Sequence, residues 1–284
     1  MLIDAIHPAC VILVGVKHAF QALGLDDQRE VFHPSVWKIK THESPAAKVS
    51  TKTALAKPEE INTTTQLVQC WFPGVHINVG GGSSSSAGEG DFQEQLASIT
   101  YTWMLDLVRP HLAFDPVELD SQKLDWESAL HANTIEQLEE KQGVKDDRYW
   151  MAKAFSSVVA VLKQREQEKP HGLAIEDIPD SHSALYDFMG PEKDRIPQNL
   201  NVDEFRAGWR THEQVHYTVA LRQSLRPDYV PHAMKGWVRE DDGTWRDPSS
   251  SRFMTESVIG NGLDEEDSME YWLRRRGVQA NQVE

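Results

Sequence analysis

The stretch Gln66–Gly82, which reads QLVQCWFPGVHINVGGG, decides the fold of this chain. Its first seven residues are a short apolar run that ends before Pro73, and such a run predicts a buried β-strand. A glycine-rich loop is expected next, and it displays His76. Apolar residues then recur at helical spacing over Phe92–Val108, which predicts a helix that stops at Arg109. A strand, a glycine-rich loop and a helix in this order predict an α/β fold.

The loop surrounds His76 with glycine: Gly74 precedes it, and Gly80, Gly81 and Gly82 follow. Glycines let another chain or a ligand approach the backbone closely. A histidine displayed after an interior strand suits a general base, which needs a nucleophile within hydrogen-bond reach and a third group to orient it. The spacing alone also fits a structural histidine. It fits a phosphate-binding loop poorly, because no Lys-Ser/Thr pair follows the glycines.

Two segments carry a family resemblance. QCWFPGVHINVGGG, followed by a helix reading LASITYTWML, closely resembles the type VI secretion phospholipase-effector-like hydrolase catalytic domain, a family also widespread in fungi. The upstream HAFQALGLDDQREVFHPSVW is similar to the family pattern H-A-L-x-L-D-E-x-R-x-x-F-x-P-x-x-W, with Asp27 in place of the usual Glu. The resemblance is strong over Lys17–Trp37 and Gln66–Asp106. A weaker likeness to the fungal C-terminal region runs through EQVHYTV and YVPHAMKGW.

The resemblance implies an α/β-hydrolase core, a Ser-Asp-His triad and the hydrolysis of acyl esters, with phospholipids as the substrates of the studied bacterial members. The catalytic histidine carries over onto His76, and the supporting loop onto Gly74, Asn78, Gly80, Gly81 and Gly82. Asn78 stands where many members have Asp, so a carboxylate that would lie beside the histidine is absent. Ser83 stands where many members have Tyr.

The nucleophile of the family is not found. No serine of the chain lies in the G-x-S-x-G pattern of a nucleophile elbow, and only 75 residues precede His76. The expectation is therefore a remnant or truncated fragment, the C-terminal portion of a serine hydrolase, with no assigned acid. Paired carboxylates are interpreted as solvated turns or helix ends and receive no site: Asp26-Asp27, Asp146-Asp147, Asp241-Asp242 and Glu265-Glu266.

Two other classes of function stay open. His212, Glu213 and His216 match H-E-x-x-H, which on a helix would hold zinc with the glutamate as general base of a metallopeptidase. A third ligand is needed, and His232 and Glu240 are candidates only because they lie downstream. An acidic chain of this kind could instead be a non-catalytic binding or regulatory protein.

The composition limits the partners. The formal net charge of −15 repels nucleic acid, which is therefore not an expected partner. The family resemblance implies a lipid or ester substrate, and no cofactor is assigned. The apolar run Ala9–Val16 is too short to span a membrane. The two cysteines, Cys10 and Cys70, are interpreted as buried thiols in a reducing, cytoplasmic compartment. The oligomeric state is not determined by the sequence.

Two regions are expected: residues 1–116 as part of the hydrolase-like domain and residues 117–284 as a mainly helical extension. Further elements are predicted from periodicity and turn residues. They are a helix from Val16 that ends before His33, helices at Leu124–Glu140, Tyr149–Glu166, Phe205–Leu225 and Leu263–Arg276, a loop at Lys38–Thr65, and a hairpin at Trp237–Trp245 around Gly243.

Overall fold

The structure is a computed structural model of the chain, and it describes residues 12, 15–41, 65–81, 95–123, 174, 178 and 193–281. The chain divides into two compact units, residues 1–79 with 179–258 and residues 80–178 with 259–284. In the described residues, the first unit holds the β-sheets and the second unit is helical. The predicted helices Leu124–Glu140 and Tyr149–Glu166 and most of the predicted loop Lys38–Thr65 lie outside the described residues.

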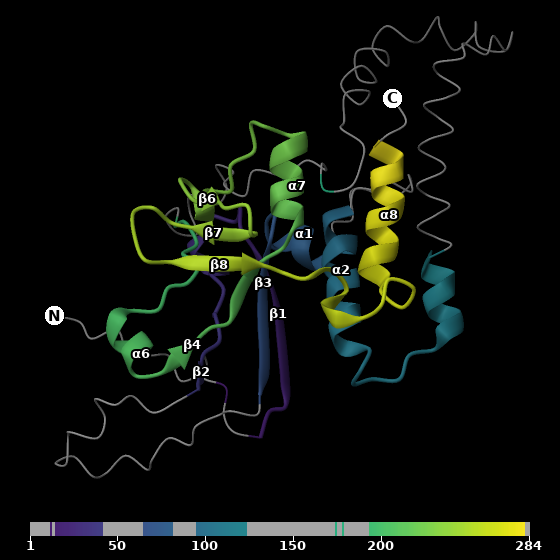
Figure 1. Cartoon of the computed structure of the whole chain (residues 1–284), viewed down its shortest axis with the longest axis horizontal. Coiled ribbons are helices and arrows are strands. Elements are labelled where there is room, and N and C mark those ends of the chain that lie inside the picture. Colours follow the sequence, from purple (N-terminus) through teal and green to yellow (C-terminus); the bar gives the residue numbers. More distant parts are fainter. Residues whose placement is uncertain are drawn as a thin grey trace, which may run out of the picture. The chain divides into compact units, whose positions relative to one another are not determined.

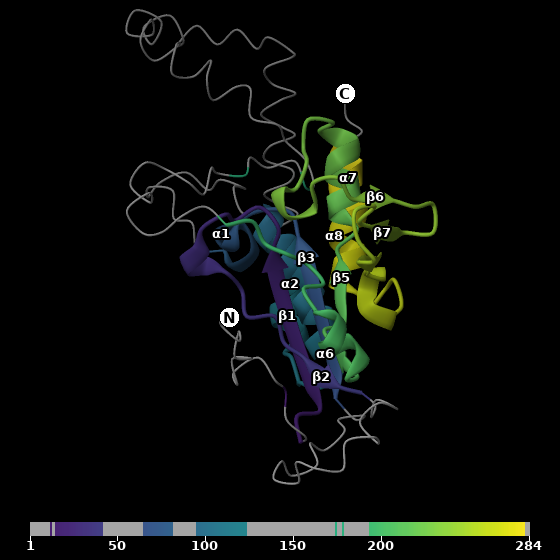
Figure 2. The ribbon, with the colours of Figure 1, turned by 90° about the vertical axis from the view of Figure 1, so that its left-hand side faces the viewer.

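A six-stranded sheet forms the centre of the first unit, in the order β1-β3-β5-β8-β7-β6 (Figure 1). The first four strands in this order run parallel, and β7 and β6 are antiparallel to their neighbours. Figure 2 shows β1, β3 and β5 lying side by side. The bounds are β1 His18–Gly24, β3 Gln66–Phe72, β5 Glu213–Val215, β6 Val238–Arg239, β7 Thr244–Arg246 and β8 Phe253–Glu256. A mostly parallel sheet with helices confirms the predicted α/β class.

The prediction of a helix from Val16 that ends before His33 is wrong, because His18–Gly24 forms strand β1. All seven residues of β1 pair in parallel with β3, from His18 opposite Gln66 to Gly24 opposite Phe72. Parallel strands are covered on both faces, so their apolar residues do not alternate and can mimic helical spacing. The predicted strand Gln66–Phe72 is confirmed as β3 with the same bounds.

The core lies against the sheet. Both Cys70 and Trp71 of β3 are fully buried although they point to opposite faces, so both faces of this strand are covered. The burial predicted for Cys70 is confirmed, and Cys10 lies outside the described residues. One hydrophobic cluster combines residues that are far apart in the sequence: Leu23, Leu25, Trp71, Val215, Val219, Met234, Trp245 and Met254.

The predicted helix Phe205–Leu225 is wrong in its middle. Helix α6, Val202–Arg206, ends before Gly208, which has a φ of +91°. Strand β4, Trp209–Arg210, pairs with β2, Ile39–Lys40, and β5 then enters the main sheet. Helix α7 follows only at Thr218–Leu225. The described part of the C-terminal half thus supplies strands as well as helices, and a mainly helical extension is not confirmed.

The predicted hairpin around Gly243 is confirmed. Strands β6 and β7 are antiparallel, with Val238 opposite Arg246. Gly243 has a φ of +79°, a backbone conformation that favours glycine, and its amide donates to the Glu240 carbonyl at 3.1 Å. A local turn signal was therefore sufficient here.

The second unit packs α2, Gln95–Val108, with α8, Met269–Asn281. Asp106 of α2 accepts hydrogen bonds from Ser268 Oγ at 2.5 Å and from the amides of Met269 and Glu270 at 2.9 and 3.0 Å. This buried carboxylate satisfies the first amides of α8. The predicted helices Phe92–Val108 and Leu263–Arg276 both exist, but the second begins later, at Met269.

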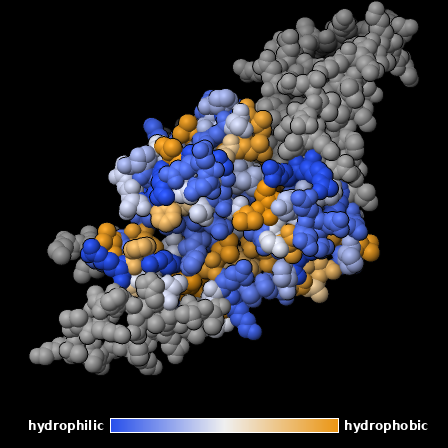
Figure 3. All heavy atoms as spheres, in the orientation of Figure 1, coloured by the Kyte–Doolittle hydropathy of each residue, from blue (hydrophilic) through white to orange (hydrophobic). Residues whose placement is uncertain are grey.

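None of the helices in the described part of the chain has the length and the apolar content that crossing a bilayer requires. On the face that Figure 3 shows, hydrophilic side chains cover most of the coloured surface, with hydrophobic groups between them. Exposed apolar residues of the first unit include Val202, Phe205, Val238 and Phe253.

Candidate active site

The candidate site lies where β1 and β3 end. Parallel strands deliver their carboxyl ends to the same edge of a sheet, and ligands of α/β proteins bind at that edge. The chain leaves β1 through Asp26 and Asp27, and it leaves β3 through Gly74 and Val75 to reach His76. The two turns stay in register, because the Leu25 amide donates to the Phe72 carbonyl at 3.0 Å and the Asp26 amide to the Gly74 carbonyl at 3.1 Å.

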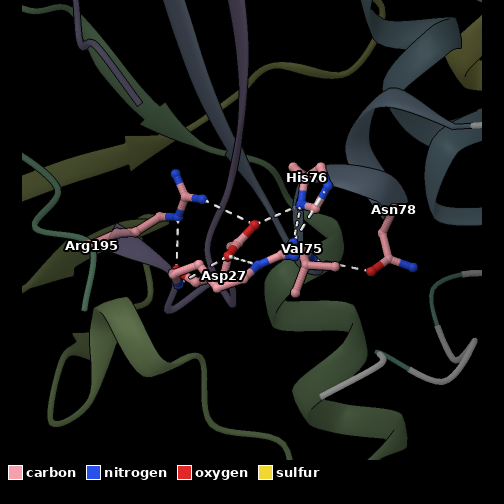
Figure 4. Close-up of polar contacts among 6 residues, drawn as sticks. Asp27, Val75, His76, Asn78 and Arg195 are labelled. Atoms are coloured by element: carbon pink, nitrogen blue, oxygen red, sulfur yellow. Dashed lines mark hydrogen bonds and ion pairs between the residues drawn. The ribbon is translucent and has the colours of Figure 1, made fainter. Parts of the chain in front are cut away.

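The sequence predicts an open loop around His76. In the structure, His76 is instead the first residue of a short helix, α1, His76–Gly80. Val75 acts as its N-cap, since its carbonyl accepts from the amides of Asn78 and Val79 at 3.0 and 3.2 Å. The buried Asn78 side chain makes a second hydrogen bond with the same residue, because its Oδ1 accepts from the Val75 amide at 3.1 Å. This is the reciprocal half of a capping box. Figure 4 shows Asn78 on the far side of Val75 from Asp27. The Asn78 side chain therefore caps α1.

The loop glycines have different structural roles. Gly74 has a φ of +109°, and a Cβ there would lie 2.6 Å from the Asn78 Cβ, so only glycine fits. Gly80 ends α1, and a Cβ there would meet nothing within 4 Å. Gly81 has a φ of +72°, and Gly82 lies outside the described residues. Of these glycines, Gly74 is the one that shapes the turn before His76.

Asp27 is the carboxylate next to His76. Its Oδ2 lies 2.7 Å from His76 Nδ1 and also accepts from the His76 amide at 3.4 Å (Figure 4). The Asp27 side chain is fully buried, whereas 43% of the His76 side chain is exposed. With Nδ1–H donating to Asp27, the imidazole presents the Nε2 lone pair as a base. Sequence reasoning assigned no acid and read Asp26-Asp27 as a solvated turn, which is wrong. The sequence feature that could have identified this carboxylate is the acidic residue at position 27, where the family pattern has Glu.

Two arginines also surround Asp27. Arg195 donates from Nε to the Asp27 carbonyl at 2.9 Å, and its terminal nitrogen lies 3.3 Å from Oδ2. The Arg29 amide and Nε donate to Oδ1 at 3.1 and 3.4 Å. Burial raises the pKa of Asp27, but the bonds from Arg29 and His76 and the charge of Arg195 outweigh it, so the pKa lies below its usual value. Asp27 is therefore ionised at neutral pH.

Arg29 also reaches the imidazole. Its terminal nitrogen lies 2.8 Å from His76 Nδ1 and 3.4 Å from Nε2. The Phe32 ring stacks on the imidazole with centroids 4.5 Å apart, and the Arg29 guanidinium lies 4.2 Å from the centre of the same ring. The segment that follows Asp27 thus supplies both a cation and an aromatic ring to His76.

Asp26 fixes the turn and does not contact the base. Its Oδ2 accepts from the Gly74 amide at 2.6 Å and from the Tyr229 hydroxyl at 2.8 Å. Burial raises the pKa of Asp26, although these hydrogen bonds and the charge of Arg222 oppose the shift. Burial and the neighbouring Asp26 also raise the pKa of Tyr229 well above its usual value, which keeps the hydroxyl a donor.

The zinc interpretation of His212, Glu213 and His216 is wrong. Glu213 lies in strand β5 and His212 has a φ of +50°, so the motif does not form the helix that would place both histidines on one face. His216 is fully buried, with Nδ1 2.7 Å from the Thr218 hydroxyl, and Glu213 Oε1 accepts from Trp71 Nε1 at 2.9 Å. No group of three His, Cys, Asp or Glu side chains that could hold a metal ion occurs in the described ranges.

Comparison with known proteins agrees with the resemblance of the two sequence segments. Residues 12–107 match the model of the T6SS phospholipase effector Tle1-like catalytic domain family. The matched range contains Asp27, Arg29 and His76. Searches of curated proteins and of solved structures each found no match.

Proposed function

We propose that this chain carries the acid–base pair of a lipid-ester hydrolase of the serine type, with His76 as the general base and Asp27 as the residue that orients it. The single observation that carries the proposal is the 2.7 Å contact between Asp27 Oδ2 and His76 Nδ1 at the carboxyl edge of the sheet. The family match over residues 12–107 supports phospholipid as the substrate class.

The proposed chemistry follows from the pair. His76 Nε2 takes the proton of a serine hydroxyl while the serine oxygen attacks the acyl carbon, and it later returns a proton to the leaving alcohol. Asp27 holds the Nδ1–H tautomer and stabilises the imidazolium that forms between these steps. Full burial of the Asp27 carboxylate strengthens this stabilisation, because water does not screen it.

The nucleophile is not assigned to a residue of this chain. None of its serines lies in the G-x-S-x-G pattern that would present a strained, exposed hydroxyl. The proposal therefore concerns the base and its acid. The chain by itself is expected to remain unmodified by a fluorophosphonate probe, and a labelled serine would contradict this expectation and identify the nucleophile.

The pair itself is tested by nitrogen-15 NMR of the His76 ring, assigned through His76→Gln. In the wild type without phosphate we expect part of the population to hold the Nδ1–H tautomer, and in Asp27→Asn we expect that part to fall. Asp194→Asn is the matched control, because this exposed carboxylate near the site bonds Gln28 and not the histidine. The same tautomer in wild type and Asp27→Asn would contradict the proposal.

A further inference from the structure

Asp27 and Arg29 compete for one atom of His76. Asp27 Oδ2 lies 2.7 Å and the terminal nitrogen of Arg29 lies 2.8 Å from the same Nδ1. A ring nitrogen carries either a hydrogen or a lone pair in the ring plane. If Nδ1 carries the hydrogen, it donates to Asp27 and cannot accept from Arg29. If Nδ1 carries the lone pair, it accepts from Arg29, and Nε2 then holds the hydrogen and is no base. The two contacts are therefore alternatives.

The charges around Asp27 favour an additional anion. The buried Asp27 carboxylate is contacted by two guanidinium groups, those of Arg29 and Arg195. The next carboxylate, Asp26, is bonded to Gly74 and Tyr229 and faces the charge of Arg222. Asp27 thus faces two positive charges, while the charge of Asp26 also acts on Arg195, and an imidazolium at His76 would add a third positive charge. Like charges this close disfavour one another unless an anion joins them.

Arg29 is the member of this group that is placed to meet a ligand. Arg195 is buried, with 4% of its side chain exposed. The Arg29 side chain is 10% exposed, and it lies over Phe32, which is 40% exposed and stacks on His76. A guanidinium matches the oxygen geometry of phosphate and carboxylate groups and forms strong charge-assisted hydrogen bonds with them. The terminal nitrogen that now contacts the imidazole can turn to such a group.

We propose that Arg29 is the substrate-recognition residue of this site, and that its guanidinium binds the phosphate group of the ester. Once Arg29 bonds the phosphate, Nδ1 of His76 is left to Asp27 alone, and Nε2 becomes the base. Substrate binding and base formation are thereby coupled, with no covalent step at Arg29. This inference rests on the proposed role of the Asp27–His76 pair.

The test is a titration of the full chain with inorganic phosphate, followed by nitrogen-15 NMR of His76. We expect phosphate to shift the ring toward the Nδ1–H tautomer. Arg29→Gln should bind phosphate about tenfold or more weakly, since a charge-assisted hydrogen bond of about 1.5–3 kcal/mol is lost. Its His76 should hold the Nδ1–H tautomer without phosphate. Arg275→Gln, which removes an arginine from an exposed pair with Glu265, should behave as the wild type.

Arg29→Lys is a second variant that keeps the test valid if Arg29→Gln does not fold. It keeps the positive charge but lacks the planar guanidinium that forms two parallel hydrogen bonds. It should bind phosphate more weakly than the wild type and leave the melting temperature near that of Arg275→Gln. Equal phosphate binding by the wild type and both Arg29 variants would overturn the inference. So would a His76 tautomer that phosphate does not change.

The source of the phosphate is separated by a second arm with phosphatidylglycerol vesicles. Arg29-dependent sedimentation with the vesicles assigns the site to a lipid headgroup, and a response to inorganic phosphate alone assigns it to soluble phosphate esters. No response to either overturns the inference. Failure of the proposed function is distinguishable, because it is read from Asp27→Asn without any phosphate present.

Discussion

Asp26 and Gly74 hold one another by two hydrogen bonds: the Asp26 amide donates to the Gly74 carbonyl at 3.1 Å, and the Gly74 amide donates to Asp26 Oδ2 at 2.6 Å. Asp26 precedes the proposed acid, Asp27, and Gly74 lies two residues before the proposed base, His76. The reciprocal bond therefore ties the turn after β1 to the turn after β3. The 2.7 Å distance between Asp27 and His76 depends on this connection.

Removing the Asp26 carboxylate should destabilise the protein. Asp26→Ala leaves the Gly74 amide and the Tyr229 hydroxyl without this acceptor in a buried position, which should lower the free energy of unfolding by about 2–4 kcal/mol. Tyr229→Phe should lower it by about 1 kcal/mol. Urea unfolding measures both. Tyr101→Phe is the control, since the exposed Tyr101 hydroxyl bonds Gln122. Equal stability of the two tyrosine variants would contradict the role given to Tyr229.

Asp27 should make stability depend on pH. Burial raises its pKa, but hydrogen bonds from Arg29 and His76 and the charge of Arg195 outweigh it, so the folded pKa lies below the unfolded value of about 3.9. A carboxyl of this kind adds stability above the unfolded pKa and loses it as the pH falls through the folded pKa.

Asp27→Asn should therefore lower the free energy of unfolding by about 3 kcal/mol at neutral pH, because two arginines lose a buried partner. The difference from the wild type should shrink as the pH falls below about 4. Urea unfolding between neutral pH and about pH 3 measures this, with Asp194→Asn as the exposed control. A difference that stays constant over the whole range would argue against the assignment.

Gly74 and Gly80 form a matched pair of glycines on either side of His76. Gly74→Ala forces a side chain into a φ of +109° and to 2.6 Å from Asn78 Cβ, so it should lower the free energy of unfolding by at least about 2 kcal/mol. Gly80→Ala adds a Cβ that meets nothing within 4 Å and should change stability by no more than about 1 kcal/mol, in the stabilising direction. Thermal melting of both variants checks this, and similar losses would refute the close-approach argument.

Asn78 is expected to act through its side-chain oxygen. Asn78→Ala removes the acceptor for the Val75 amide and should cost about 1 kcal/mol. Asn78→Asp keeps that oxygen and places a negative charge at the start of α1, so it should cost less than Asn78→Ala. The His76 tautomer should be the same in Asn78→Asp and in the wild type. A changed tautomer would place residue 78 in the charge network of the base.

Parts of the site were predictable and parts were not. The proposed base, His76, could be named from a local pattern, because a strand, glycines and a family motif surround it. Asp27 was overlooked because adjacent carboxylates are usually solvated. The family pattern does have two acidic residues, Asp and Glu, at positions 26 and 27. Arg29 stands at the Arg of the family pattern, but only folding shows that it reaches a buried carboxylate. Arg195 could not be chosen among the 29 lysines and arginines for the same reason.

The local sequence by itself determined β3, the β6–β7 hairpin and α2, because apolar runs, turn residues and helical spacing act between near neighbours. Only the tertiary structure decided that His18–Gly24 is a strand and that the H-E-x-x-H segment is extended. In both cases the backbone hydrogen bonds come from distant segments, residues 66–72 for β1 and residues 69–71 for β5. The proposed acid–base pair follows the same rule. Asp27 and His76 are 49 positions apart, and parallel pairing of β1 with β3 brings them to the same edge of the sheet.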